Sequence, residues 1–277
     1  VDFSGKAALS NWQNATGNLN INLDQAGANF QGMKLNIPRL TTTMKLADGV
    51  VELQLLMQAL GGTLQVTGDG DLHEPFDANV VLRAESIHLG QLFANDDNSS
   101  PPVAGVMDVD MRLMAPLLSW NTKASGEGAV SLRRGIIARI PVISALLDTM
   151  SRAKNVVKSG NIRKRGDEAD MMFYFKGDHI DITKLSIIGG WFAARGKGRV
   201  NFDRTMDIWV NGGPMEKLQD QLGKVGQVLG IVTDRVTKYQ ISGDIAEPQV
   251  KVRPLGIGPK LEEPVVRQVD EDDGGIF

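Results

Sequence analysis

The sequence predicts a mainly β fold, a long antiparallel arrangement of strands with two helices in its second half. Three observations predict it. Most of the 277 residues alternate between apolar and polar side chains with a period of two, which is the period of a β-strand. Short turns with Gly, Asn, Asp or Pro separate many of these runs. Two segments break the alternation with apolar residues at helical spacing.

The alternation is clearest in the stretch TGNLNINLD. Leu19, Ile21 and Leu23 fall on one side of an extended chain and asparagines fall on the other, as in a sheet with one apolar and one polar face. A strand-like run also opens the chain, in VDFSGKAALS. Similar runs predict strands over residues 33–46, 50–57, 62–72, 77–84, 104–114, 122–132, 169–176, 180–188, 190–202, 205–211, 237–244 and 247–253.

Helical spacing marks two longer segments, near 141–159 and 214–236. In the first, apolar residues such as Leu146 and Met150 recur one turn apart, and a proline stands where the first turn begins. The second places an apolar stripe along its length and also begins with a proline. Both read as amphipathic helices. A short helix is also predicted over 86–93.

The composition suggests how the chain is divided. The run NDDNSSPP at 95–102 is typical of a loop and is the best internal boundary. We expect residues 1–100 to form N-terminal β repeats and 101–254 to form a second β region that contains both helices. Residues 255–277 are Pro-, Gly- and acid-rich, which predicts a disordered tail. Because the chain has no signal peptide and no long apolar run, we expect any targeting or anchoring segment to lie upstream of it.

The side chains that carry chemistry are sparse. The chain has no cysteine, which excludes disulfides, thiolate nucleophiles and cysteine-ligated zinc. The three histidines, His73, His88 and His179, have no metal-ligand spacing, and there is no Gly-x-Ser-x-Gly motif of a hydrolase. A net charge of −3 argues against a general nucleic-acid binder. The sequence therefore predicts a protein that is not an enzyme and that has no metal and no cofactor.

One glycine-rich stretch resembles a nucleotide loop at first sight. GGTLQVTGDGDL at 61–72 recurs as GGWFAARGKGRV at 189–200, and alternation places the glycines of both copies on the apolar side of a strand. A phosphate loop would instead place them between a strand and a helix. Asp69, Asp71 and Glu74 supply too few oxygens for a calcium loop. We interpret these glycines as bends, bulges or points where another backbone approaches closely.

A size argument limits the architecture. A dozen strands spaced by ~4.8 Å make a sheet on the order of 60 Å wide. The longer predicted helix spans only about 33 Å, so two helices cannot cover the apolar face. The sheet must close on itself, stack as a sandwich, or stay curved with an apolar groove. An open groove costs ~25 cal/mol per Å² of exposed apolar surface, and it makes sense where the ligand is itself long and apolar. Periodicity alone leaves these three alternatives open.

A basic segment lies around the first predicted helix. Between residues 133 and 165 there are nine basic side chains, and Asp148 is the only acid. Such a cluster attracts anionic lipid headgroups or an acidic partner, although a solvated helix face and loop is the simpler alternative. The candidate headgroup contacts are Arg133, Arg134, Arg152, Lys154, Lys158, Arg163, Lys164 and Arg165, with Arg139 lying among them in the sequence.

A family resemblance begins at GIIARIPVISALLDTMSRAKN. A strand that ends in G-x-I-x-x-I-P and leads into an I-x-x-L-L-D helix resembles the C-terminal region of AsmA-like proteins. The order that follows is also similar: the strands of FYFKGDHIDITKLSIIGGWFAARGKGRVNFDRTMDIWV, an amphipathic helix, and closing strands in YQISGDIAEPQVKVRPL. The resemblance covers residues 104–254, and residues 1–100 fit as preceding repeats of the same sheet.

The resemblance implies a long, curled antiparallel sheet whose concave apolar groove carries phospholipid between the inner and outer membranes. It implies a largely periplasmic protein with an inner-membrane anchor, a role in outer-membrane biogenesis, a membrane surface as partner, and no catalytic residues. The alternative is a non-catalytic structural or assembly module of the cell envelope that binds a protein partner. We expect the groove for acyl chains to be lined by Leu64, Val66, Leu72, Phe192, Ala194, Val200, Phe202 and Ile208.

Overall fold

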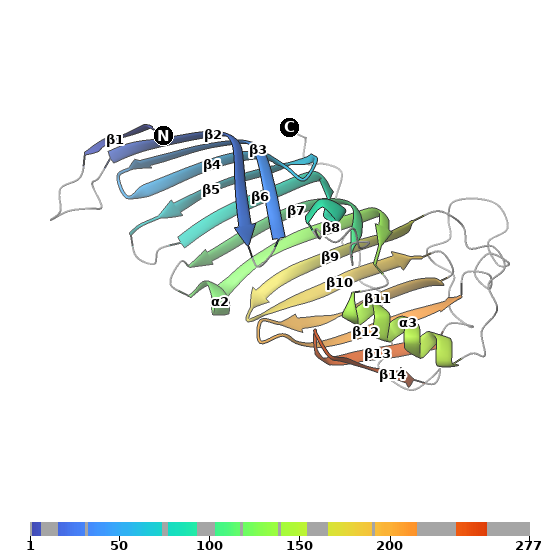
Figure 1. Ribbon diagram of the computed structural model, residues 1–277. Coiled ribbons are helices and arrows are strands. Elements are labelled where there is room, and N and C mark those ends of the chain that lie inside the picture. Colours follow the sequence, from blue (N-terminus) through green and yellow to red (C-terminus); the bar gives the residue numbers. More distant parts are fainter. Residues whose placement is uncertain are drawn as a thin grey trace, which may run out of the picture.

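The computed structural model describes most of the chain as one antiparallel sheet (Figure 1). The described residues are 2–6, 16–30, 33–73, 77–92, 103–116, 119–137, 140–153, 166–189, 192–214 and 237–253. The strands are β1 (Asp2–Lys6), β2 (Thr16–Phe30), β3 (Met33–Ala47), β4 (Val50–Ala59), β5 (Gly62–Asp71), β6 (Asp77–His88), β7 (Ala104–Pro116), β8 (Ala124–Ile136), β9 (Asp167–Gly177), β10 (His179–Ile188), β11 (Phe192–Asn201), β12 (Thr205–Pro214), β13 (Thr237–Asp244) and β14 (Pro248–Arg253). The helices are α1 (Leu89–Leu92), α2 (Trp120–Lys123) and α3 (Pro141–Ala153).

These elements confirm the mainly β prediction and one of the two predicted amphipathic helices, α3. Several boundaries differ from those predicted, two of them because another element occupies the expected residues. The short helix expected from residue 86 begins at Leu89, because β6 continues to His88. The strand expected from residue 122 begins at Ala124, because α2 precedes it. The predicted helix near 214–236, the loop at 95–102 and the tail at 255–277 fall outside the described residues, apart from Pro214, which ends β12.

The sheet grows by adding one strand after another. Its 14 strands are ordered in space as in the sequence, from β1 to β14. Two-residue turns make two of the early hairpins, at Asp48–Gly49 (φ 49° and 74°) and at Leu60–Gly61 (φ 53° and 72°). Positive φ at both turn positions is the type I′ geometry whose twist matches that of the flanking strands. Short turns therefore keep sequence neighbours paired.

The sheet stays open. Its end strands β1 and β14 each have one neighbour and do not pair with each other, so the sheet is not a barrel. Figure 1 shows a curved strip whose extent across the strands is greater than the length of the strands. Within the described ranges all strands belong to this one sheet, which excludes a sandwich there. Of the three alternatives, these residues adopt the open, curved sheet.

The register carries the apolar side chains across the whole sheet. Cross-strand pairs connect one apolar row without a break from β2 to β14, and parallel rows run from Leu19 and from Leu23 on the same side. The middle row is Ile21, Thr42, Leu55, Val66, Leu82, Met111, Gly128, Phe173, Ile182, Gly198, Ile208, Ile241 and Val250. We call this side the apolar face and the opposite side the polar face.

A packed core occupies the C-terminal part of the apolar face, where α3 lies over the last strands (Figure 1). Leu146 of α3 has no exposed surface, and Met150 is nearly buried. Small residues form the part of the sheet beneath these side chains, where Ala194 and Gly212 are paired on β11 and β12. A Cβ added at Gly212 would lie 3.4 Å from the Met150 methyl group. Small side chains let a helix approach the sheet closely.

Several of the repeated glycines mark close backbone contacts, as interpreted from the sequence. A Cβ at Gly68 of β5 would lie 2.8 Å from the Asn79 carbonyl oxygen, and one at Gly198 of β11 would lie 2.3 Å from the Asp207 carbonyl oxygen. Each glycine lies within a strand and beside a neighbouring strand, not in a turn that leads to a helix. The stretch at 61–72 is therefore strand β5 with its preceding turn.

Candidate functional site: the apolar face

The N-terminal part of the apolar face is incompletely covered. Along β4, every second residue from Val51 to Met57 is half-buried, and the residues between them are exposed. Leu53 and Leu55 are not members of the packed core that contains α3. In β2 the same pattern holds for Leu19 and Ile21. Side chains of this kind present a continuous half-exposed apolar strip over β2 to β5.

Three predicted groove residues lie on this strip. Leu64 and Val66 project from β5 to the apolar face, and Leu72 follows the end of the strand; all three are half-buried. Leu64 touches the edge of the packed core, and Val66 is paired with Leu55 of β4. The fold thus brings these side chains together with neighbours that alternation alone cannot identify.

The other predicted groove residues are in different surroundings. Phe192, Ala194 and Ile208 are buried in the core with α3, and Val200 packs against that core. Phe202 is 37% exposed in the turn after β11 and is not part of a strand. The eight predicted positions are therefore divided between an open part of the apolar face, a covered part and a turn.

The predicted basic cluster is only partly visible. Arg133 and Arg134 lie where β8 bulges against β7, and Arg133 forms an ion pair with Asp108. Asp108 also accepts a hydrogen bond from the Ser86 backbone N–H, at 2.8 Å, where β6 bulges. Arg133 therefore joins β8 to β7 at this bulge. Arg152 belongs to α3, and the predicted contacts from residue 154 to residue 165 fall outside the described residues.

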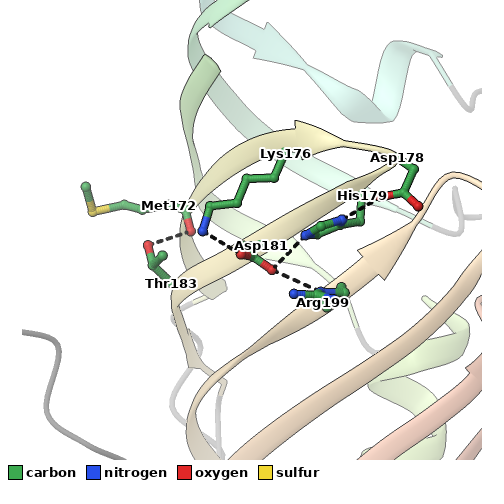
Figure 2. Close-up of polar contacts among 7 residues, drawn as sticks. All are labelled: Met172, Lys176, Asp178, His179, Asp181, Thr183 and Arg199. Carbon is green, nitrogen blue, oxygen red and sulfur yellow. Dashed lines mark hydrogen bonds and ion pairs between the residues drawn. The ribbon is translucent and has the colours of Figure 1, made fainter. Parts of the chain in front are cut away.

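A charged network crosses the polar face of β9, β10 and β11 (Figure 2). Asp181 of β10 lies at its centre, with its carboxylate 2.8 Å from Lys176 Nζ and 3.2 Å from Arg199 Nε. His179 lies between two carboxylates, 2.8 Å from Asp178 and 3.5 Å from Asp181. The network joins three neighbouring strands on the side opposite the apolar core.

These contacts lower the pKa values of Asp178 and Asp181. Partial burial is the largest single effect on the pKa of Asp181 and raises it, but the hydrogen bonds and positive charges of Lys176 and Arg199 together outweigh burial, so the pKa lies below its usual value. The hydrogen bond from His179 holds the pKa of Asp178 below its usual value. Both carboxylates are therefore ionised at neutral pH.

This constellation lacks the geometry of nucleophilic catalysis. The nearby Thr183 hydroxyl donates to the Met172 carbonyl oxygen at 3.3 Å, across a bulge in β10, rather than to the His179 imidazole (Figure 2). A hydroxyl nucleophile needs a base within hydrogen-bond reach.

Within the described ranges, no three His, Asp or Glu side chains are grouped so that they could hold a metal ion. Nor does any described helix have the length and apolar character needed to cross a membrane.

Two hollows lie on the polar face in the middle of the sheet. The larger, of about 810 Å³, extends from Arg83 on β6 to Lys184 on β10 and has Asp108 and Asp170 in its wall. The smaller, of about 310 Å³, adjoins it and includes Tyr174. Both are lined by side chains of mixed charge.

Comparisons with known proteins leave the chain without a named relative. No protein-family model, no curated protein and no solved structure matches it. The resemblance to AsmA-like proteins therefore rests on the sequence motifs.

Several apolar-face residues were missed by reasoning from the sequence. Leu53, Leu55 and Met57 belong to the open strip, and their spacing of two residues was visible in the sequence, although Leu56 interrupts the polar positions between them. Their neighbours across the strands were not visible, because pairing register depends on turn lengths and bulges. Exposed Met172 and Tyr174 on the polar face were also missed, since alternation predicts polar residues there.

Proposed function

We propose that the protein binds phospholipid through its acyl chains on the apolar face and conducts it along the sheet. In this proposal it is the periplasmic part of an AsmA-like protein with an upstream inner-membrane anchor, and it supports outer-membrane biogenesis. The single observation that carries the proposal is the apolar face itself, which is continuous across the sheet and half-exposed over β2 to β5.

The energetics favour an apolar ligand. Covering a half-exposed leucine or valine removes apolar surface from water, and full burial of one such side chain contributes ~1.5–3 kcal/mol. The open strip contains many of these side chains, for example Leu53, Leu55 and Val66. A long hydrocarbon chain would cover several of them at once. A small polar ligand would cover few and would find only the Thr42 hydroxyl as a hydrogen-bonding side chain on the middle row.

Conduction is supported by the absence of charge on the path. None of the residues in the middle row, from Ile21 to Val250, is charged, and the single hydroxyl is that of Thr42. A charged side chain would impose a desolvation cost on an acyl chain that passes it. Where the row is half-exposed, over β2 to β5, an acyl chain can slide from one strand to the next while its headgroup stays in water.

The part of the apolar face that α3 covers is not included in the proposed binding site. Phe192 and Ile208 contact the core under α3, so an acyl chain reaches them only if α3 moves. We therefore place the binding site on the open strip, with Leu55, Leu64 and Val66 at its centre. A charge at Phe192 would be buried and is expected to unfold the protein, which makes this residue unsuitable for testing transport.

Two adjacent leucines provide a matched test. Leu55 points to the apolar face and is half-buried, whereas Leu56 points to the polar face and is 46% exposed. We expect native mass spectrometry of the purified wild type to detect bound phospholipid. Leu55→Arg should lower the bound fraction at least tenfold, because the arginine places a charge on the acyl path, and Leu56→Arg should leave it unchanged.

Circular dichroism of both variants provides the control for folding. If wild-type protein purified from a membrane-containing lysate is consistently free of lipid, the proposal fails. The structural or assembly module that binds an envelope protein then becomes the better interpretation. Equal loss of lipid in both leucine variants would show that binding does not depend on the apolar face.

A further inference from the structure

The two longest strands extend beyond the sheet. β2 and β3 have 15 residues each, whereas β4 and β5 have 10. β4 is paired with β3 only as far as Arg39, but the pairing of β3 with β2 continues to the pair of Met33 and Phe30. Residues 26–30 and 33–37 therefore form a two-stranded extension that pairs with no other described strand, and we call it the β2–β3 ribbon.

The β2–β3 ribbon begins at a bend in both strands. Gln25 has a φ of 57°, in the left-handed region that residues other than glycine seldom occupy. Gln25 and Pro38 occupy opposite positions, and they are missing from the cross-strand pairing. Pro38 has no backbone N–H to contribute there. Figure 1 shows the ends of β2 and β3 turning out of line with the rest of the sheet.

The bend shifts the alternation of apolar residues by one position in each strand. Leu23 belongs to the apolar face, and the next apolar residue of β2 is Ala26, three positions later. In β3, Ile37 and Leu40 are half-buried and the two residues between them are exposed. One extra residue in each strand, as in a β-bulge, carries the apolar side through the bend.

The β2–β3 ribbon thus has an apolar and a polar side. Ala26 and Ile37 are a half-buried cross-strand pair, whereas Gly27 and Asn36, the next pair, are both exposed. At the spacing of the first pair, the register continues to join apolar residue types, namely Ala28 with Leu35 and Phe30 with Met33.

The bend directs the β2–β3 ribbon toward the apolar face. β3 contacts α1, whose Leu89 belongs to the packed core of that face. Ala59, which ends β4 beside the bend, is only 3% exposed although it lies outside that core. In Figure 1 the ribbon and α3 both lie in front of the sheet. The ribbon therefore lies on the side of the sheet that carries the open strip.

The β2–β3 ribbon is long enough to extend over this strip. Five extended residues span roughly 17 Å, and three neighbouring strands at ~4.8 Å span about 14 Å. A ribbon that leaves the sheet at β3 can therefore reach across β4, β5 and β6. Met57 and Leu64, the strip residues in register with Leu40 beside the bend, are still half-buried. The ribbon thus does not close over them as a packed second layer.

We propose that the β2–β3 ribbon is the second wall of the acyl-chain site. The hydrocarbon lies between the ribbon, at Ala26 and Ile37, and the open strip, at Met57 and Leu64. A chain covered on two sides exposes less apolar surface to water than one on an open face, so it dissociates more slowly. The bend at Gln25 positions this wall. Because the ribbon contacts the same acyl chain, its role rests on the proposed lipid function.

Two substitutions at Gln25 test the bend. Gln25→Val should straighten the strands, because a β-branched residue strongly disfavours positive φ. Gln25→Gly is the matched control, since glycine accepts positive φ and keeps the bend. Transfer of pyrene-labelled phosphatidylcholine from the loaded full chain to acceptor vesicles measures its release. We expect Gln25→Val to release the lipid roughly tenfold faster than wild type. Gln25→Gly should release it at the wild-type rate.

A second measurement detects the contact itself and needs no change at the bend. The chain has no cysteine, so Ile37→Cys and Asn36→Cys each allow a single fluorophore to be attached, on the apolar and the polar side of the β2–β3 ribbon. Phosphatidylcholine with a spin label on its acyl chain should quench the fluorophore at position 37 strongly. The fluorophore at position 36 should be quenched much less.

The outcomes separate the ribbon from the lipid function. A wild type that binds neither labelled lipid would overturn both. If wild type binds lipid and Leu55→Arg does not, but Gln25→Val releases it at the wild-type rate, the second wall is overturned and the open strip stands. Equal quenching at positions 36 and 37 would also overturn the second wall. Circular dichroism of Gln25→Val should match that of wild type, because the ribbon lies outside the main sheet.

Discussion

The two ends of the apolar face have the same sequence pattern and different surroundings. Leu55 on β4 and Ile241 on β13 belong to the same cross-strand row, and the chain neighbours of both point to the polar face. Leu55 is half-buried outside the packed core, whereas Ile241 is only 1% exposed within it. The difference is α3, which packs on β13 and β14. Alternation determines which face is apolar, but a covering element determines whether that face is a core or a surface.

Local sequence explains why the helix packs where it does. Ala194 and Gly212 are small and opposite each other, so the sheet has room for the Leu146 and Met150 side chains of α3. In the open strip, α1 contacts β3 but covers no comparable area, because it has only four residues. Among the described helices, none covers the bulky side chains in the open part of the face as α3 covers those of the core.

The largest expected effect comes from removing the same kind of side chain at the two ends of this row. Ile241→Ala should lower the free energy of unfolding by about 2–5 kcal/mol, because it leaves a cavity in a packed core. Leu55→Ala should lower it by about 1 kcal/mol or less, since the site is already partly exposed to water. Urea unfolding measures both. Equal losses would mean that the N-terminal strip is packed as tightly as the C-terminal core.

The glycine repeat sharpens the comparison. Gly198 in the covered half and Gly70 in the open half occupy equivalent positions of the two copies. Gly198→Ala should cost about 1–3 kcal/mol, as overpacking does, because the new Cβ meets the Asp207 carbonyl oxygen at 2.3 Å. Gly70→Ala meets its nearest atom, the Asp77 carbonyl oxygen, at 3.8 Å and should be nearly neutral. Thermal unfolding of the pair checks this, and a destabilised Gly70 variant would contradict it.

The smallest expected effect comes from removing the charge of Asp181, on the polar face of the C-terminal part of the sheet. The pKa of Asp181 is below its usual 3.8, so its ion pairs stabilise the fold above that pH and lose this contribution as pH falls through the lower folded-state pKa. The pairs with Lys176 and Arg199 are partly exposed, so Asp181→Asn should cost about 1 kcal/mol at pH 7. Urea unfolding at pH 7 and near pH 2 should show the difference from wild type shrinking with acid. A difference that does not depend on pH would mean that the charge is not responsible.

The positions of the strands could be predicted from the sequence, but the surroundings of their side chains could not. Period-two alternation located the strands and assigned Leu64 and Val66 to the apolar side, because side chains of a strand must point to opposite faces. It also placed Phe192 there, but it could not tell that α3 covers this residue, since helix docking is a long-range contact. Register shifts at bulges, such as the one around Arg134 in β8, likewise have no period to reveal them. Such shifts decide which side chains become neighbours.

The central claim is that the open strip of the apolar face holds acyl chains. Its most direct test places a photo-crosslinking amino acid at single positions of the protein in cells and measures covalent attachment of phospholipid. Ile21, Leu55 and Val66 lie in the middle row on the open strip of the apolar face, and Leu56 is the control on the polar face. We predict phospholipid adducts at the three row positions and none at Leu56. No adduct at any row position, or adducts of equal yield at Leu56, would contradict the account.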